Sequence, residues 1–179
     1  MPSAKNKTIM ATINPYVHFN GNAEEAFTFY KSVFGGEFGK IMRYKDLSHA
    51  EYPVAENDAN RIMHITLPIG KSHLLMASDV LEIMGKVTET DNRNTISISA
   101  ENREEADKLF NGLSEGGKVE MPIANGPLGS YFGMFADKFG VHWNDRALID
   151  NLASVSSKLY SASVLADIPV FNICFYLPV

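Results

Sequence analysis

Residues 13–36 read INPYVHFNGNAEEAFTFYKSVFGG, and residues 95–117 read TISISAENREEADKLFNGLSEGG. Each stretch contains a strand-like run, a polar break, a helix with Glu-Glu-Ala in its first turns and a closing Gly-Gly pair. Aligning Ala26 with Ala106 superposes the two Glu-Glu pairs, and the apolar residues of each helix then follow the spacing i, i+3, i+4, i+7. The repetition predicts two copies of one β-α unit.

Each unit is followed by three further strand-like runs. They lie at 38–44, 62–68 and 73–77 in the first copy, and at 118–122, 132–137 and 141–144 in the second. The fold class expected is therefore α+β, with two paired βαβββ modules forming a cup-shaped eight-stranded sheet. The predicted organisation is a disordered N-terminus (1–10), one domain (11–144) and a C-terminal extension (145–179). Within the domain we expect module one at 11–78, a linker at 79–94 and module two at 95–144.

The C-terminal extension leaves several interpretations open. Residues 145–160 have helical spacing of apolar residues, and the end of the chain reads IPVFNICFYLPV. The last run is compatible with an added strand, with a clasp on a partner subunit or with an unnatural extension.

Composition excludes several classes of protein. The chain has 179 residues, a net charge of −5 and no Lys/Arg cluster, which argues against binding to nucleic acid or to an anionic membrane. Cys174 is the only cysteine, so an internal disulfide cannot form. With neither a signal-peptide pattern nor a long apolar run, we expect no membrane partner and a cytoplasmic location.

Three runs carry a family resemblance: NPYVHFNGNAEEAFTFYKSVFGGE, LLMASD and GMFADKFGVHWN. They resemble the PhnB-like branch of the vicinal oxygen chelate superfamily, which contains glyoxalase I, bleomycin-resistance proteins and extradiol dioxygenases. The branch also carries the label 3-demethylubiquinone-9 3-methyltransferase domain. The resemblance covers about residues 11–144, and it implies the same paired modules, usually in a homodimer.

The resemblance also implies where a metal would bind. Metal-dependent members take ligands from the first and last strands of each module, and these positions fall on Pro15, Met76, Thr95 and Asn144. None of the four is a histidine, a carboxylate or a cysteine, so we expect no metal and no cofactor. The alternative is a metal-dependent lyase, isomerase or dioxygenase whose site uses His18, His64 or His142, which leaves open whether the chain is an enzyme.

Methyl transfer from S-adenosylmethionine has little support in the sequence. That reaction usually needs a Gly-rich loop between a strand and a helix, together with an acidic residue for the ribose. The Gly-Gly pairs of this chain follow its helices and are typical of helix ends.

We therefore expect the cup to bind a small, partly apolar molecule. The predicted ligand-binding residues are His64, Met76, Asp79, Phe132, Phe135, Trp143 and Asn144. With Pro15 taken as inward, alternation places Val17 and Phe19 on the cup face and His18 against the helix. Purely structural roles are the alternative to ligand binding. His18 can be a packed, hydrogen-bonded side chain, Asp79 can cap a turn, and the aromatic residues can belong to the hydrophobic core. A third hypothesis is an interaction protein whose apolar C-terminal extension contacts a partner.

Overall fold

A computed structural model describes residues 12–47, 53–88, 93–126 and 130–147. Module one contains β1 (Tyr16–Phe19), α1 (Ala23–Phe34), β2 (Lys40–Arg43), β3 (Ile62–Ile69) and β4 (His73–Asp79). Module two contains β5 (Ile96–Ala100), α2 (Arg103–Ser114), β6 (Lys118–Asn125), β7 (Tyr131–Ala136) and β8 (His142–Ala147). The predicted α+β class with two βαβββ modules is confirmed.

The connections differ from the sequence prediction in detail. Between the predicted strand-like runs at 38–44 and 62–68 the chain forms two short 3-10 helices, η1 (Tyr44–Leu47) and η2 (Glu56–Asp58), and the linker contains a third, η3 (Glu82–Met84). Strand β8 continues to Ala147, so the predicted helix is wrong for its first three residues, 145–147. The remainder of the C-terminal extension and the N-terminal residues 1–10 lie outside the described residues.

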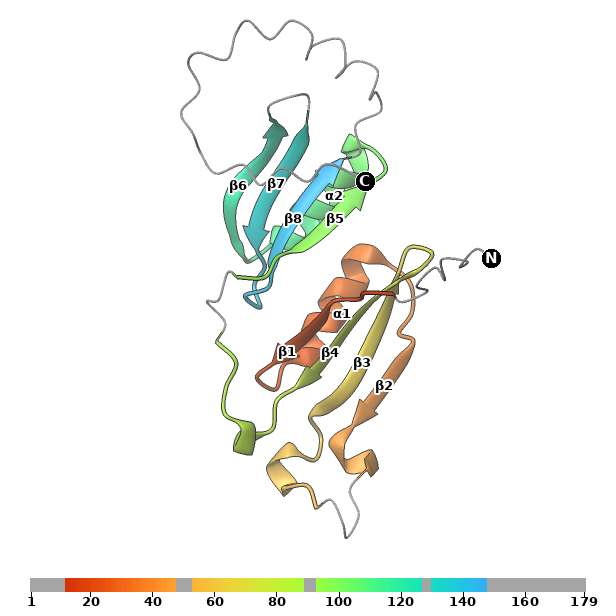
Figure 1. The fold of residues 1–179 in the computed structure, drawn as a ribbon, viewed down its shortest axis with the longest axis vertical. Coiled ribbons are helices and arrows are strands. Elements are labelled where there is room, and N and C mark those ends of the chain that lie inside the picture. Colours follow the sequence, from red (N-terminus) through yellow and green to blue (C-terminus); the bar gives the residue numbers. More distant parts are fainter. Residues whose placement is uncertain (1–11, 48–52, 89–92, 127–129, 148–179) are drawn as a thin grey trace, which may run out of the picture.

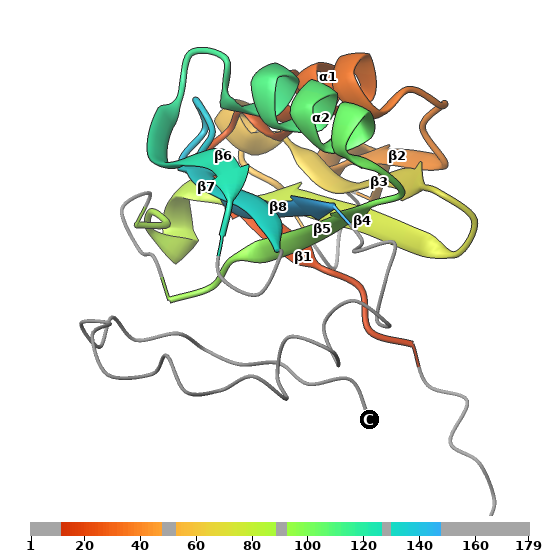
Figure 2. The ribbon, with the colours of Figure 1, turned by 90° about the horizontal axis from the view of Figure 1, so that it is seen from above.

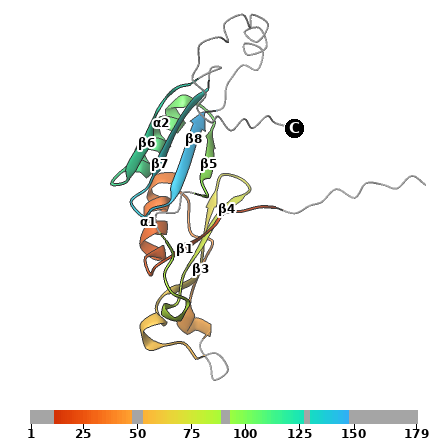
Figure 3. The ribbon, with the colours of Figure 1, turned by 60° about the vertical axis from the view of Figure 1, so that its left-hand side comes forward.

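The eight strands are divided between two four-stranded sheets. Sheet one has the order β1-β4-β3-β2 and sheet two has the order β5-β8-β7-β6, so the two modules repeat one topology. In each sheet the first strand pairs in parallel with the last, and the other pairs are antiparallel. The sheets follow one another along the long axis of the molecule (Figure 1). Both helices cover the same side of the two sheets (Figures 2 and 3), so in the described part of the chain no α-helix covers the opposite side.

One hydrophobic core joins the modules beneath the helices. Phe27 and Tyr30 of α1 are fully buried, and they belong to the same cluster as Phe110 of α2 and Trp143 of β8. Tyr30 packs edge-on against Trp143, with ring centroids 5.6 Å apart. Tyr30 and Phe110, which the repeat alignment makes equivalent, are both core residues, as the helical spacing predicts.

The two helix N-termini are capped differently. The Asn102 side chain accepts a hydrogen bond from the backbone N–H of Glu105, as expected for a capping residue. Asn22 stands at the equivalent position before α1, but its side chain makes no capping hydrogen bond. Instead Oδ1 of Asp79 accepts the backbone N–H groups of Gly21 and Ala23, at 2.9 and 3.0 Å.

Candidate functional site

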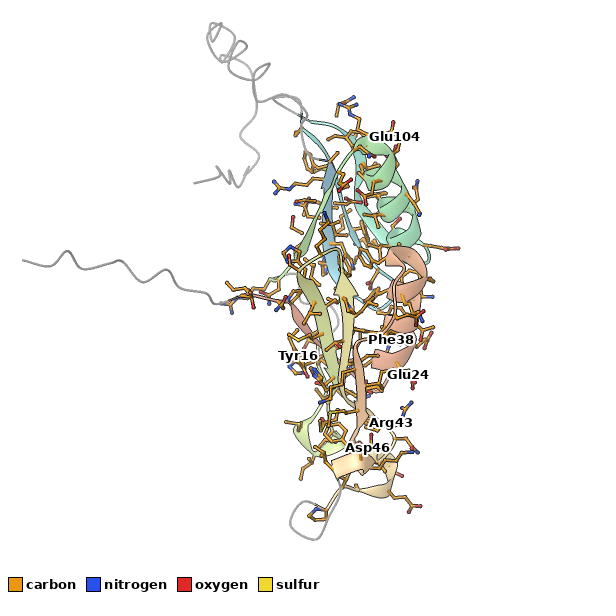
Figure 4. The ribbon with its side chains drawn as sticks, turned by 90° about the vertical axis from the view of Figure 1, so that its right-hand side faces the viewer. Tyr16, Glu24, Phe38, Arg43, Asp46 and Glu104 are labelled. Atoms are coloured by element: carbon orange, nitrogen blue, oxygen red, sulfur yellow. The ribbon has the colours of Figure 1, made fainter. Side chains whose placement is uncertain are left out.

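The face of each sheet opposite the helices, called here the open face, corresponds to the predicted cup. Strand β1 fixes its orientation: Phe19 packs edge-on against Phe27 of α1, and Val17 packs against the core. Tyr16 and His18 therefore point to the open face, and Figure 4 shows Tyr16 on the side away from the helices. The predicted alternation, with Val17 and Phe19 in the cup and His18 against the helix, is wrong because the larger apolar side chains are drawn to the core.

Sheet one presents a group of aromatic and polar side chains on its open face. The ring of Tyr16 lies between two imidazoles, with centroids 5.3 Å from His18 and 5.8 Å from His64. Its hydroxyl is 3.4 Å from Nδ1 of His64, and Nδ1 of His18 is 3.1 Å from Oγ of Ser78. We call Tyr16, His18, His64 and Ser78 the tyrosine–histidine cluster. It offers hydrogen-bonding groups and flat ring surfaces side by side.

Sheet two presents a different set at the equivalent positions. Asn144 and Arg146 alternate along β8 with the buried Trp143 and Asp145, so both point to the open face. Their register partners across the sheet are Ser97 and Ser99 on β5 and Met134 and Phe132 on β7. We call these six residues the asparagine–arginine cluster. It combines hydroxyl, amide and guanidinium groups with two apolar side chains.

The seven predicted ligand-binding residues divide between the two faces of the sheets. The residues that lie on the open face are His64, Met76, Phe132 and Asn144. The other three, Asp79, Phe135 and Trp143, are at most 2% exposed and lie on the helix side, so their predicted placement in the cup is wrong. Ligand binding by any of the seven stays a prediction.

Each of the three buried residues has a structural partner. Oδ2 of Asp79 accepts the backbone N–H of Ile62 at 2.8 Å, in addition to its two bonds at the start of α1. The indole N–H of Trp143 donates to Oδ2 of Asp137 at 2.8 Å. Phe135 packs edge-on against Phe110, with ring centroids 5.0 Å apart. The turn-cap role of Asp79 and the core role of the aromatic residues therefore account for their positions.

Asp145 is a buried carboxylate that the sequence analysis did not single out. It is fully buried on the helix side of β8, and neither of its carboxylate oxygens has a hydrogen-bond partner. Burial raises the pKa of Asp145 to about 7, and the negative charges of Glu105 and Asp107 on α2 add to the rise. It lies on the opposite side of β8 from the asparagine–arginine cluster.

A hollow lies on the helix side. It has a volume of about 600 Å³, and it is lined by Phe29, Ser32, Val33, Lys108, Gly112, Glu115, Gly116 and Lys138. The hollow contains none of the predicted ligand-binding residues.

Comparison with known proteins decides the family. The family model for 3-demethylubiquinone-9 3-methyltransferase matches residues 11–144. The chain belongs to this family. A crystal structure of protein PA1353 from Pseudomonas aeruginosa is 36% identical, with a TM-score of 0.67 over 76% of this chain and 97% of that chain. A structure from Bacillus cereus described as a putative 3-demethylubiquinone-9 3-methyltransferase, PhnB protein, is 27% identical, with a TM-score of 0.60 over 77% of this chain and 100% of that chain.

The fold is that of a wider superfamily. A glyoxylase/bleomycin resistance protein/dioxygenase domain from Frankia sp. EAN1pec is 11% identical, with a TM-score of 0.57 over 80% of this chain and 96% of that chain. The family model and the Bacillus cereus structure make this protein PhnB-like, and the likeness to the Frankia domain shows that its paired modules have the cup-shaped fold of glyoxalase, bleomycin-resistance and dioxygenase proteins. The comparisons confirm the resemblance stated from the sequence.

The superfamily's metal site can be tested against the side chains present. The positions on the open face of β1, β4, β5 and β8 hold Tyr16, His18, Leu74, Met76, Ser78, Ser97, Ser99, His142, Asn144 and Arg146. They include two imidazoles, His18 on sheet one and His142 on sheet two, and no carboxylate. In the part of the chain that the structure describes, no three His, Cys, Asp or Glu side chains come together in a way that could hold a metal ion. The residues present therefore do not fit a divalent metal site of the superfamily type.

The predicted metal positions need one correction. Pro15 belongs to the chain before β1, where its carbonyl accepts the backbone N–H of Met76, so the equivalent open-face positions on this strand are Tyr16 and His18. His142 points to the open face of sheet two, where its Nδ1 lies 3.3 Å from Glu120. His18 and His64 are on sheet one, so the three histidines considered for an alternative metal site come from different sheets.

The structure also bears on a membrane role. Among the described residues no helix has both the length and the apolar character that crossing a bilayer requires.

Proposed function

We propose that this PhnB-like protein binds a small, partly apolar molecule on the open face of its sheets, without a metal ion. The observation that carries the proposal is the tyrosine–histidine cluster. Tyr16 is 42% exposed, although its ring packs against two imidazoles and its hydroxyl is within reach of His64. Exposed aromatic rings beside convergent hydrogen-bonding groups are typical of small-molecule sites.

The donor chemistry favours binding over metal-assisted catalysis. Of the side chains on the open face of β1, β4, β5 and β8, only His18 and His142 are usual metal ligands, and their Nδ1 atoms already contact Ser78 and Glu120. A lyase, isomerase or dioxygenase mechanism would need two or more further ligands at these positions. We therefore derive no catalytic step through a metal for this chain.

We further propose that two copies associate as a homodimer in the cytoplasm. Strands β1 and β5 each have one neighbour in their four-stranded sheets, so each is an edge strand of its sheet in the described chain. Edge strands carry unpaired backbone groups that a second chain can satisfy. Light scattering coupled to gel filtration tests this: a mass of two chains supports the homodimer, and a mass of one chain contradicts it.

A thermal-shift screen tests the binding proposal. Protein dialysed against a chelator is mixed with a library of small, partly apolar molecules, and the hits are repeated on the variants Tyr16→Phe and His64→Ala. Ligands that stabilise the wild-type protein, and stabilise the variants less, support the proposal. Stabilisation that appears only after a divalent metal is restored contradicts it.

A further inference from the structure

Among the described residues, the guanidinium group of Arg146 has no acidic partner. Its Nε donates to Oγ of Ser99 at 3.1 Å, and none of the ion pairs among the described residues includes it. The side chain is exposed on the open face of sheet two. A guanidinium held at Nε keeps its two terminal nitrogens available, which is the arrangement that binds a carboxylate through two parallel hydrogen bonds.

Asn144 lies two residues earlier on the same face of β8. Its Oδ1 is buried and has no hydrogen-bond partner in the described part of the chain, although a buried acceptor normally has one. Residues two apart on a strand are separated by about 7 Å, so a long arginine side chain and an asparagine side chain can reach the same small molecule. Asn144 thus holds an acceptor without a partner just beneath the open face, next to a guanidinium that forms no ion pair with the described residues.

Apolar side chains border both groups. Phe132 is the register partner of Arg146 on β7, and Met134 is the partner of Asn144. Both are partly exposed, so they provide a wall that an apolar group can cover. The charged group, the acceptor and the apolar wall lie within one short stretch of sheet two.

We propose that the asparagine–arginine cluster selects small carboxylates that carry a hydroxyl group and an apolar group. The carboxylate binds the terminal nitrogens of Arg146, and the apolar group covers Phe132 and Met134. The Asn144 side chain turns toward the open face, so that its Oδ1 accepts the hydroxyl. This inference rests on the proposed function, because it names the class of ligand that the open face takes.

Three small molecules separate the contributions that the carboxylate charge and the hydroxyl group make to binding. Mandelate carries a carboxylate, a hydroxyl and a phenyl ring; phenylacetate lacks the hydroxyl; and mandelamide lacks the charge. We expect isothermal titration of the full chain to rank mandelate above both others, with mandelamide weaker by about tenfold or more, as a lost charge-assisted hydrogen bond implies. Equal affinity for mandelate and mandelamide, or binding of none of the three, overturns the inference.

Three variants of the protein test whether the preference for mandelate over mandelamide depends on Arg146. Arg146→Gln should bind mandelate and mandelamide equally weakly, and Arg146→Lys should keep part of the preference because it keeps the charge without the planar fork. Arg103→Gln removes the same charge from α2, where Arg103 lies over the ring of Tyr131, and should bind as the wild type does. A preference for mandelate that survives in Arg146→Gln contradicts the inference.

The proposed function can fail or hold independently of this result. Neutral ligands that bind the open face, found in the thermal-shift screen, would support binding on this face even if carboxylates show no preference. Thermal unfolding of each variant shows whether it is folded, and Arg146→Lys keeps the test informative if Arg146→Gln is not.

Discussion

The phenol of Tyr30 donates a hydrogen bond of 2.7 Å to Oδ2 of Asp137, joining α1 of module one to the turn between β7 and β8 of module two. The same oxygen accepts the indole N–H of Trp143, and Oδ1 accepts the backbone N–H groups of Phe139 and Val141. Burial raises the pKa of the Tyr30 phenol, and the neighbouring charge of Asp137 adds to the rise, so the phenol stays protonated as a donor. The two modules are therefore linked by a polar contact within their shared core.

Removing the Tyr30 hydroxyl should weaken this link. Tyr30→Phe keeps the ring and leaves a buried carboxylate with one partner fewer, so we expect a loss of about 1 to 3 kcal/mol in the free energy of unfolding. Urea unfolding measures it. Tyr44→Phe is a matched control, because its hydroxyl donates to a backbone carbonyl, that of Asp79, at a partly buried site. An effect of Tyr30→Phe no larger than that of the control would contradict the proposed link.

Asp145 should make stability depend on pH. Its folded-state pKa, about 7, lies above the ordinary value of 3.8. The protonated form is thus favoured in the folded protein, and the associated stability is fully present below about pH 4 and is lost as pH rises through 7. We expect Asp145→Asn, which keeps the shape without the charge, to remove this dependence. Urea unfolding from pH 4 to pH 8 measures both proteins, and parallel curves would contradict the account.

Asp79 should act on stability rather than on ligand binding. Its carboxylate accepts three backbone N–H groups, so Asp79→Ala leaves three donors without their partner. We expect a loss of roughly 3 kcal/mol or more in the free energy of unfolding. Ligand affinity of the folded fraction should stay at the wild-type value. A selective loss of affinity at unchanged stability would restore the predicted role at the rim of the cup.

Trp143 reports which side of sheet two a ligand contacts. It is the only tryptophan of the chain and is 2% exposed on the helix side. We expect emission typical of a buried indole and little quenching by iodide. Ligands on the open face should leave that protection unchanged. Strong quenching in the native protein would mean that Trp143 lines the cup, as the sequence analysis predicted.

The sequence was sufficient for the fold because its signals are local and repeated. The Glu-Glu-Ala helices, their Gly-Gly ends and the strand-like runs between them predict two modules, and the structure has both. The apolar stripe of α1 correctly placed Tyr30 in the core. What local patterns could not show is that Asp79, from the far end of β4, would replace Asn22 as the cap of α1, since that contact joins residues 56 positions apart.

The candidate site was harder to predict from the sequence than the fold. Each wrong prediction about the site placed a side chain on the wrong face of its strand. Taking Pro15 as inward reversed every side chain of β1, since neighbouring residues point to opposite faces. The correct signal was present: Val17 and Phe19 are the apolar members of the alternation, and Tyr16 and His18 are the polar ones. The same rule on β8 separates Trp143 from Asn144 and Arg146. Asp145 breaks that rule as a buried carboxylate, and no local pattern predicts it.

The central claim is that ligand binding on the open face needs no metal. The most direct measurement is isothermal titration of one hit from the screen into chelator-dialysed protein, repeated after adding zinc, nickel, manganese or iron(II). The account predicts the same dissociation constant with and without each metal, and a weaker one for Tyr16→Phe under both conditions. A ligand that binds only when a metal is restored would contradict it.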